Sequence, residues 1–194
     1  MIKFEKVRWK NFLSTGNQFT EIELDRNETT LIIGENGAGK STVLDALCFA
    51  LFGKPFRTIS KSQLINTVNA METVVEIEFS IASRKYKVIR GIKPNKFEIW
   101  QNDKMLNQEA NSRDYQKILE QQILKLNYRS FTQVVILGSS TFVPFMQLKA
   151  KFRREVVEDL LDIKIFSVMN LLLRQRLKDL ASEYKNSKFI VDVK

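Results

Sequence analysis

A glycine-rich segment at residues 34–41 is the part of this sequence best suited to chemistry. It reads Gly-Glu-Asn-Gly-Ala-Gly-Lys-Ser and matches the pattern G-x-x-x-x-G-K-[ST]. Glycines let several backbone N–H groups turn toward one phosphate chain, and the dipole of a following helix adds positive charge. The pattern predicts a nucleotide-binding loop, and a glycine-rich turn with an incidental lysine is the weaker interpretation.

The residues of this loop have separate expected roles. We expect Lys40 to reach the β- and γ-phosphates as a mobile charge, which makes it the candidate catalytic residue. The Ser41 hydroxyl is the candidate Mg²⁺ ligand, and Thr42 adds a contact to the α-phosphate. The candidate nucleotide-binding residues are Asn36, Gly37, Ala38, Gly39, Lys40, Ser41 and Thr42.

Hydrolysis needs a further group, an acidic residue at the end of a second buried strand that holds the metal and polarises water. The sequence offers no convincing one. Glu76 falls in a half-exposed strand pattern, Asp192 in a polar terminal stretch, and Glu158-Asp159 in a helical pattern. The 194 residues therefore read as half of an active site.

Composition narrows the function further. The 194 residues carry 31 basic and 22 acidic side chains, a net charge of +9, which favours polyanionic partners. With no histidine and one cysteine, Cys48, the usual zinc sets and histidine-based triads are excluded. Met1 to Lys10 have no apolar core, so we expect neither a signal peptide nor a membrane anchor, and a cytoplasmic location.

The elements that must position the loop follow from the pattern of apolar residues. Continuous apolar residues at 31–33 predict a strand covered on both faces, and residues 42–52, with almost no polar face, predict a buried helix that ends at Gly53. The other expected elements are a bulged strand over 2–9, a strand at 21–24, an antiparallel meander over 73–79, 85–90 and 96–100, a helix over 114–126, a buried strand at 134–137 and a long amphipathic helix from Arg153.

Basic residues gather in the predicted meander. Lys85, Lys87 and Arg90 are the candidate DNA-binding residues, because lysine and arginine bind phosphates regardless of sequence. A solvated sheet face with ordinary surface charge explains the same pattern equally well. Cys48 lies within the apolar helix and is expected to be a buried small hydrophobic residue.

Several segments together resemble a known family. Residues 11–14 and 34–46 resemble the N-terminal half of the ATPase heads of SMC-like, SbcC-type DNA repair proteins. More specific segments look like the phage branch of that family, the large subunits of T-even recombination endonucleases. These segments are residues 53–57, 63–66, 90–95, 144–146, 153–154 and 157–161, so the resemblance covers essentially the whole chain.

The resemblance implies an α/β fold, the N-terminal lobe of a P-loop ABC-type ATPase head with a mixed sheet around the P-loop helix and an antiparallel meander. It implies ATP and Mg²⁺ as cofactors, and a C-terminal lobe of the same ATPase that carries the missing carboxylate and the signature loop. It also implies that two heads form a homodimer around two ATP molecules, and that ATP state controls the access of DNA ends to an SbcD-type nuclease subunit.

The sequence departs from the family at two positions of the expected site. Ser139 stands where cellular relatives have the glutamine of the Q-loop, and we expect its hydroxyl to contact the metal; Gln133 lies earlier, on the predicted strand. Leu13 stands at the position of a basic nucleotide contact, which leaves Ser14 as the candidate there.

We therefore expect an ATPase head lobe at residues 1–162 and the start of a coiled-coil arm, truncated before its apex, at 163–194. The expected function is ATP-dependent double-strand-break repair or recombination in the cytoplasm, of a host cell if the chain is phage-encoded, with hydrolysis only in combination with the C-terminal lobe. Two alternatives remain: a self-sufficient P-loop kinase or GTPase, and a structural SMC-like protein that tethers DNA.

Overall fold

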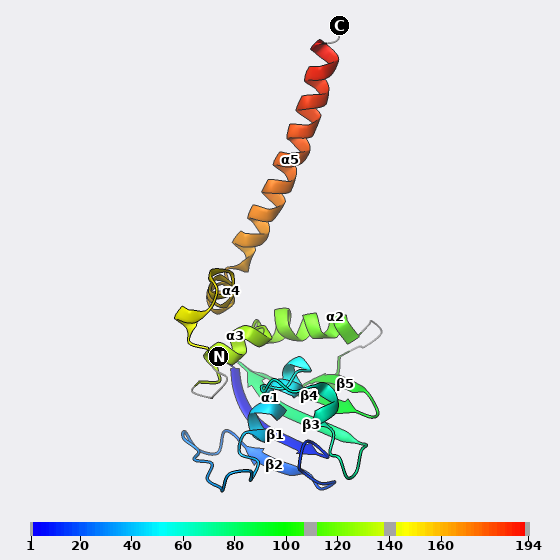
Figure 1. Ribbon diagram of the computed structural model, residues 1–194, viewed down its shortest axis with the longest axis vertical. Helices are drawn as coiled ribbons and strands as arrows, with labels where there is room; N and C mark the ends of the chain where they lie inside the picture. Colours follow the sequence, from blue (N-terminus) through cyan, green and yellow to red (C-terminus); the bar gives the residue numbers. More distant parts are fainter. Residues whose placement is uncertain (1, 107–111, 138–142, 193–194) are drawn as a thin grey trace. The chain divides into compact units, whose positions relative to one another are not determined.

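The computed structural model describes residues 2–106, 112–137 and 143–192. They belong to two compact units, residues 1–143 and residues 144–194, which are described separately (Figure 1). The first unit holds a sheet and the phosphate loop. The second unit holds two helices.

The first unit is built on a six-stranded sheet in the order β2-β1-β3-β4-β5-β6, with every neighbouring pair antiparallel. The strands are β1 (Ile2–Lys10), β2 (Thr20–Glu23), β3 (Thr73–Ile81), β4 (Arg84–Ile92), β5 (Lys96–Gln101) and β6 (Lys104–Met105). The predicted meander is confirmed in β3, β4 and β5. Turn residues at short spacing favour antiparallel pairing, which is why sequence alone was sufficient here.

The predicted irregularity of the first strand is also confirmed. The pairing of β1 with β3 shifts register between Phe4 and Lys6. Because one extra residue moves the following side chains to the other face, Val7 and Trp9 become buried.

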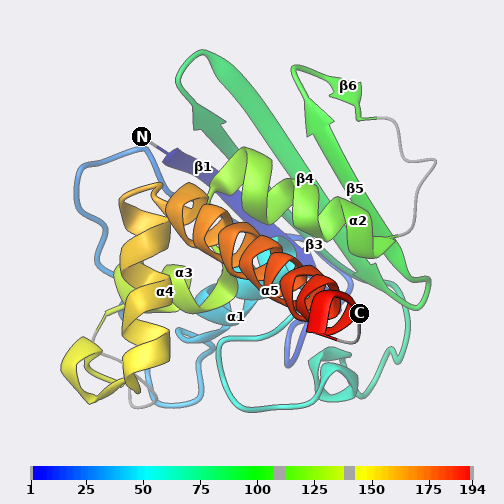
Figure 2. The same ribbon diagram turned by 90° about the horizontal axis from the view of Figure 1, so that it is seen from above.

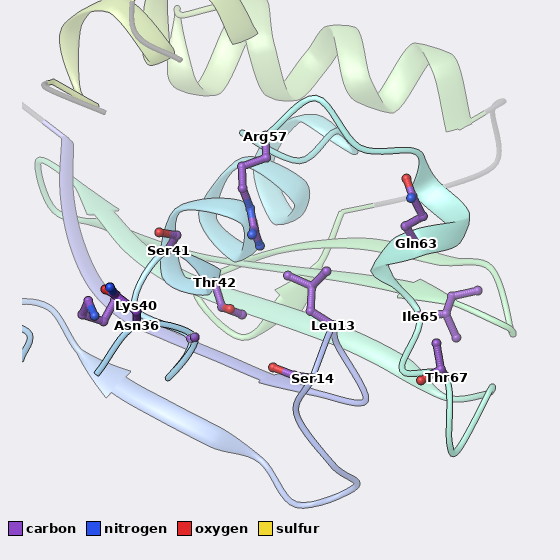
Figure 3. Close-up of a pocket in the computed structure, with 12 residues that line it drawn as sticks. Leu13, Ser14, Asn36, Lys40, Ser41, Thr42, Arg57, Gln63, Ile65 and Thr67 are labelled. Atoms are coloured by element: carbon purple, nitrogen blue, oxygen red, sulfur yellow. The ribbon is translucent and has the colours of Figure 1, made fainter. Parts of the chain in front are cut away.

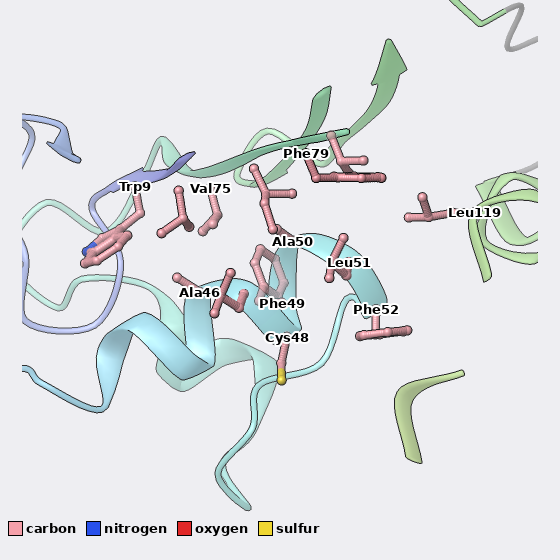
Figure 4. Close-up of a cluster of buried hydrophobic side chains, with 14 of the residues drawn as sticks. Trp9, Ala46, Cys48, Phe49, Ala50, Leu51, Phe52, Val75, Phe79 and Leu119 are labelled. Atoms are coloured by element: carbon pink, nitrogen blue, oxygen red, sulfur yellow. The ribbon is translucent and has the colours of Figure 1, made fainter. Parts of the chain in front are cut away.

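Helix α1 (Thr42–Phe52) is the centre of the core and confirms the helix predicted for this segment. It lies over β1, β3 and β4, and Figure 4 shows its apolar side chains among those of the strands. Cys48 is fully buried, as expected. Gly53 ends the helix at φ +68°, a left-handed conformation that glycine adopts without strain.

Helices α2 (Ser112–Lys117) and α3 (Tyr128–Val134) lie on the same face of the sheet as α1 (Figure 1 and Figure 2). A stretch of π-helix, η2 (Ile118–Leu124), continues α2, so the predicted helix over 114–126 is confirmed apart from its winding. A short 3₁₀ helix, η1 (Lys61–Leu64), follows α1.

Two predicted strands are wrong. Residues 134–137 form no strand: the Asn127 side chain accepts a hydrogen bond from the Ser130 N–H and starts α3, which continues through Val134. Residues 31–33 are a loop, and Leu31 and Ile33 are 79% and 83% exposed. A strand covered on both faces needs strand neighbours, and no described residue pairs with this segment.

The second unit consists of a 3₁₀ turn, η3 (Phe145–Gln147), and the helices α4 (Ala150–Leu160) and α5 (Lys164–Asp192). The predicted long amphipathic helix is thus two helices, since Asp162 adopts φ +52° between them. Within the described residues, no helix combines the length and the apolar character that crossing a bilayer requires.

Candidate nucleotide-binding site

The phosphate loop runs directly into the N-terminus of α1 (Figure 3). Gly37 and Gly39 have φ values of +90° and +89°, so the loop needs glycine at both positions. Two hydrogen bonds hold its shape, from the Ala38 N–H to the Glu35 carbonyl (3.2 Å) and from the Thr42 N–H to the Gly39 carbonyl (2.9 Å). The loop therefore presents backbone N–H groups and a helix N-terminus, the arrangement that binds phosphate.

Lys40 folds over its own loop. Its Nζ donates to the carbonyl oxygens of Gly34 (2.5 Å) and Glu35 (2.8 Å). An ammonium group has three donors, and these two acceptors are neutral. A phosphate oxygen is a stronger, charged acceptor, so Lys40 can exchange these carbonyls for a phosphate chain without leaving the loop.

A cavity of about 540 Å³ opens beside the loop. Its lining includes six of the seven residues predicted to bind the nucleotide, with Ala38 as the exception, and it also includes Ser14. The structure thus brings the candidate Ser14 to the phosphate loop across more than twenty residues of sequence. The remaining lining residues are Leu13, Arg57, Gln63, Ile65 and Thr67 (Figure 3).

One wall of this cavity comes from two segments that are bonded to each other. Phe12 and Ile65 form an isolated antiparallel bridge, and the Leu13 N–H donates to the Leu64 carbonyl at 2.7 Å. Leu13 itself has φ +54°. The two segments make a wall of the cavity that is partly apolar through Leu13 and Ile65, which suits a nucleoside better than further phosphates.

Arg57 enters the cavity from the loop after α1 and is held by Asp45. The Asp45 carboxylate is fully buried and accepts from the Arg57 backbone N–H (3.0 Å), from Nε (2.7 Å) and from Nη2 (2.5 Å). The Arg57 side chain stays 44% exposed. A fork of this kind fixes the direction of the guanidinium group, so a positive charge faces the cavity in a defined place.

Sequence reasoning missed Arg57, Gln63, Ile65 and Thr67 as site residues. One signal was present: Asp45 sits in a helix that is otherwise apolar, and a buried carboxylate requires a cation or several donors. No comparable signal marked the other three residues, because nothing in their types or spacing reveals a pocket wall.

These residues offer few ligands for a magnesium ion. Ser41 is exposed at the start of α1 and offers one hydroxyl oxygen, which suits a hard cation that is mainly bound by phosphate oxygens. Within the described part of the chain, no group of three or more acidic, cysteine or histidine side chains could hold a metal. Glu76 is engaged elsewhere, because its carboxylate binds Arg8 at 2.7 Å and Lys87 at 3.0 Å.

The structure does not bring the three basic candidates together. Lys85 and Lys87 point to the face of β4 away from α1, where Lys87 also binds Glu78 at 3.3 Å. Arg90 points to the opposite face: its Nε donates to the Ala50 carbonyl at 3.0 Å and its Nη2 to Gln116 at 2.7 Å.

Arg90 therefore stabilises the fold instead of facing solvent. Its guanidinium carbon lies 3.8 Å from the centre of the Phe97 ring, and its donors satisfy carbonyls in the last turn of α1. Burial lowers the pKa of Arg90 to about 10, and the nearby Glu120 carboxylate opposes that shift. The group remains protonated at neutral pH but is not presented on the surface.

Two further candidates concern the Q-loop. Ser139 lies outside the described residues. Gln133 lies on α3, so the strand on which the sequence placed it does not exist.

Comparison with known proteins identifies the family of the chain. The family model described as "AAA domain" matches residues 6–190, and the chain belongs to this family. The chain is 45% identical over 170 residues to exonuclease subunit 2 of Enterobacteria phage T4, a match that covers 88% of this chain and 30% of that protein. It is 27% identical over 210 residues to the SbcC component of the nuclease SbcCD of Pseudomonas aeruginosa, covering 90% of this chain and 17% of that protein.

A solved structure supports the fold. An SMC ATPase studied for ATP-driven dimerization and DNA stimulated activation has a TM-score of 0.57 and 24% identity, and the match covers 81% of this chain and 99% of that chain. The resemblance to SbcC-type proteins and the SMC-like head fold expected from the sequence are confirmed. The chain spans about a third or less of the length of the relatives it matches.

Proposed function

We propose that this chain is the ATP-binding N-terminal lobe of a DNA double-strand-break repair or recombination ATPase. The observation that carries the proposal is the cavity at which the phosphate loop, Ser14 and Arg57 meet. Membership of the AAA family and similarity to exonuclease and SbcCD components support the same conclusion.

In this proposal the loop residues 36–42, Lys40 among them, bind the phosphates, and Arg57 lines the same cavity. The N–H groups of the loop and the α1 dipole neutralise phosphate charge, and the Lys40 ammonium moves from the Gly34 and Glu35 carbonyls to the β- and γ-phosphates. Mg²⁺, when bound, neutralises charge on the phosphate oxygens, and Ser41 would hold it with one hydroxyl. The wall formed by residues 13–14 and 63–67 receives the nucleoside.

Hydrolysis in this proposal needs groups from outside the chain. Among the described residues no carboxylate faces the loop in the way a water-polarising group must. A C-terminal lobe of the same ATPase would supply that carboxylate, and a second head in a homodimer would supply the signature loop. Ser139 remains a proposed metal contact. The head lobe would end near residue 162, with α5 as the beginning of a coiled-coil arm.

The partners in this proposal are DNA and an SbcD-type nuclease subunit, whose access to DNA ends ATP would control in the cytoplasm. The net charge of +9 supports DNA as a partner. Exposed Lys85, together with Lys87, is the proposed DNA contact on the sheet. Arg90 is set aside because it binds the carbonyls of α1.

The test is complementation. This chain would be mixed with the separately produced C-terminal lobe, and magnesium-dependent ATP turnover would be measured for each part and for the mixture. We expect turnover well above the sum of the parts, and a Lys40→Ala chain as matched control should abolish the gain. No gain in a mixture shown to associate would contradict the proposal.

The alternatives predict different results, one in the turnover of the isolated chain and the other in a separate measurement of DNA affinity with and without ATP. A self-sufficient kinase or GTPase turns over nucleotide as the isolated chain. A structural DNA-tethering protein binds DNA with the same affinity whether ATP is present or absent.

A further inference from the structure

We propose that Asn66 is a positioning residue that fixes the nucleoside-facing wall of the pocket, an inference that rests on the nucleotide-binding function proposed above. This wall joins residues 13–14 to residues 63–67, which are about fifty positions away in sequence. Ile65 and Thr67 line the cavity, whereas Asn66 between them is turned into the protein and is 7% exposed. Its side chain therefore contacts the wall on the side that faces the protein interior, away from the cavity.

Every hydrogen-bonding site of the Asn66 amide is used. Its Nδ2 donates to the Leu13 carbonyl at 3.1 Å and to the Thr15 carbonyl at 3.0 Å. Its Oδ1 accepts from the backbone N–H groups of Val68 at 2.9 Å and Asn69 at 3.0 Å. An amide has two donor hydrogens and two acceptor lone pairs, so all four are used. The side chain thereby joins residues 13–15 to the turn at residues 66–69.

The two carbonyls that Asn66 binds flank Ser14, the residue that faces the cavity. The turn needs such support, because Leu13 holds φ +54°, a conformation that residues with a side chain seldom adopt. Backbone bonds tie the start of the turn, from the Asn66 N–H to the Asn11 carbonyl at 3.0 Å. The Asn66 side chain is what reaches across to Thr15 at its far end.

The phosphate loop has its own supports, the bonds from Ala38 to Glu35 and from Thr42 to Gly39 and the helix α1. Loss of the Asn66 amide should therefore loosen the nucleoside wall and leave the phosphate loop in place. Because a preformed wall lowers the ordering cost of binding, ATP should be affected and a bare phosphate chain should not.

The experiment measures the affinity of the whole 194-residue chain for two probes, MgATP and magnesium tripolyphosphate, by calorimetry. Asn66→Ala removes all four bonds of the side chain. Asn66→Asp keeps its shape and both acceptor bonds but places a carboxylate oxygen against the carbonyls of Leu13 and Thr15. Both variants should bind MgATP about tenfold more weakly than the native protein and tripolyphosphate equally well.

Asn69→Ala is the matched control. Its Nδ2 donates to Asn11 at 2.6 Å in the same cluster, but it does not bind the carbonyls beside Ser14. This variant should keep the native ratio of the two affinities.

Three results would overturn the inference: an unchanged MgATP affinity in both Asn66 variants, an equal loss for both probes, or the absence of a cooperative melting transition in both variants. The last would mean that Asn66 serves the fold rather than the wall. If the native protein itself binds neither probe, the nucleotide-binding proposal fails, and that result is distinct from the other three.

Discussion

At the scale of single residues, two basic side chains near the phosphate loop differ in their partners. Among the described residues, Lys40 binds only neutral carbonyls, so its charge is uncompensated and ready for an anion. Arg57 is matched to Asp45, a fully buried carboxylate. The first charge is free to move toward phosphate, and the second is fixed in direction.

Replacement of Lys40 by alanine should remove most of the affinity for MgATP while the fold stays intact. Hydrogen bonds to charged groups contribute about 1.5–3 kcal/mol, which corresponds to roughly ten- to hundredfold in affinity. Calorimetric titration measures the loss, and an unchanged melting temperature serves as the control. Native-like affinity in the variant would show that Lys40 does not serve the phosphates.

The Asp45–Arg57 pair should matter for stability more than the exposure of Arg57 indicates. Arg57→Ala leaves a buried carboxylate with one remaining donor, and we expect a loss of about 2 kcal/mol after allowance for the exposed side of the pair. Urea denaturation measures this loss.

Arg57→Lys is the matched control for the fork geometry and should recover only part of the loss. In a double-mutant cycle, Asp45→Asn and Arg57→Ala should be non-additive by at least about 1 kcal/mol. Additive effects would mean that the two side chains do not stabilise each other.

At the scale of elements, the core depends on one helix. Helix α1 buries ten of its eleven residues, and its C-terminal carbonyls are satisfied by Arg90 and Gln116 rather than by water. An arginine that sequence reasoning assigned to DNA thus completes a helix end. The same buried face carries Cys48, which offers a direct probe of the helix.

Cys48 should be inert in the folded protein, and it should link stability to pH. Burial, and to a smaller degree the Asp45 charge, raises the pKa of the Cys48 thiol above its unfolded value of about 8.5. A raised pKa contributes stability that is complete below the unfolded value and is lost as the pH rises above it. Unfolding free energies measured from pH 7 to 10 should therefore fall above about 8.5, with Cys48→Ala as the control that flattens this part of the profile.

Labelling gives an independent measurement of the same feature. A thiol reagent at pH 8 should modify Cys48 only at the rate of global unfolding, since the side chain is fully buried. Fast labelling of the native protein would contradict the position of α1.

The elements that were predicted correctly are those whose structure is determined by residues close together in the sequence. The meander has turn residues between short alternating strands, and α1 has an apolar pattern with a glycine end, so neighbouring residues determine both. The strands expected at 31–33 and 134–137 rested on apolar runs alone, which do not specify a pairing partner. The phosphate loop was visible in sequence, whereas the wall of the pocket depends on the contact of residues 11–15 with 64–69, which no local pattern encodes.

At the scale of the whole molecule, the net charge is +9, but some of the basic side chains form ion pairs and others do not. On the sheet face away from α1, Lys6 binds Glu21 at 2.9 Å and Lys96 binds Glu98 at 3.1 Å, so much of that face neutralises itself. Any DNA contact there depends on the few lysines that remain exposed, of which Lys85 is the leading candidate.

DNA binding should therefore respond modestly to Lys85→Ala. We expect weaker duplex binding and a reduction of the salt slope by roughly one phosphate contact, because each such contact releases counterions. Titrations at several salt concentrations measure the slope. Lys104→Ala, an exposed lysine on β6, is the control, and an unaltered slope in the Lys85 variant would remove this face from the DNA contact.

The loop that precedes the phosphate-binding residues has a practical consequence for the behaviour of the chain in solution. Leu31, Ile32 and Ile33 are three adjacent aliphatic side chains that face water, immediately before Gly34. Clustered exposed apolar surface promotes self-association. Colloidal stability therefore depends on these three residues, and light scattering should rise with protein concentration unless another surface covers them.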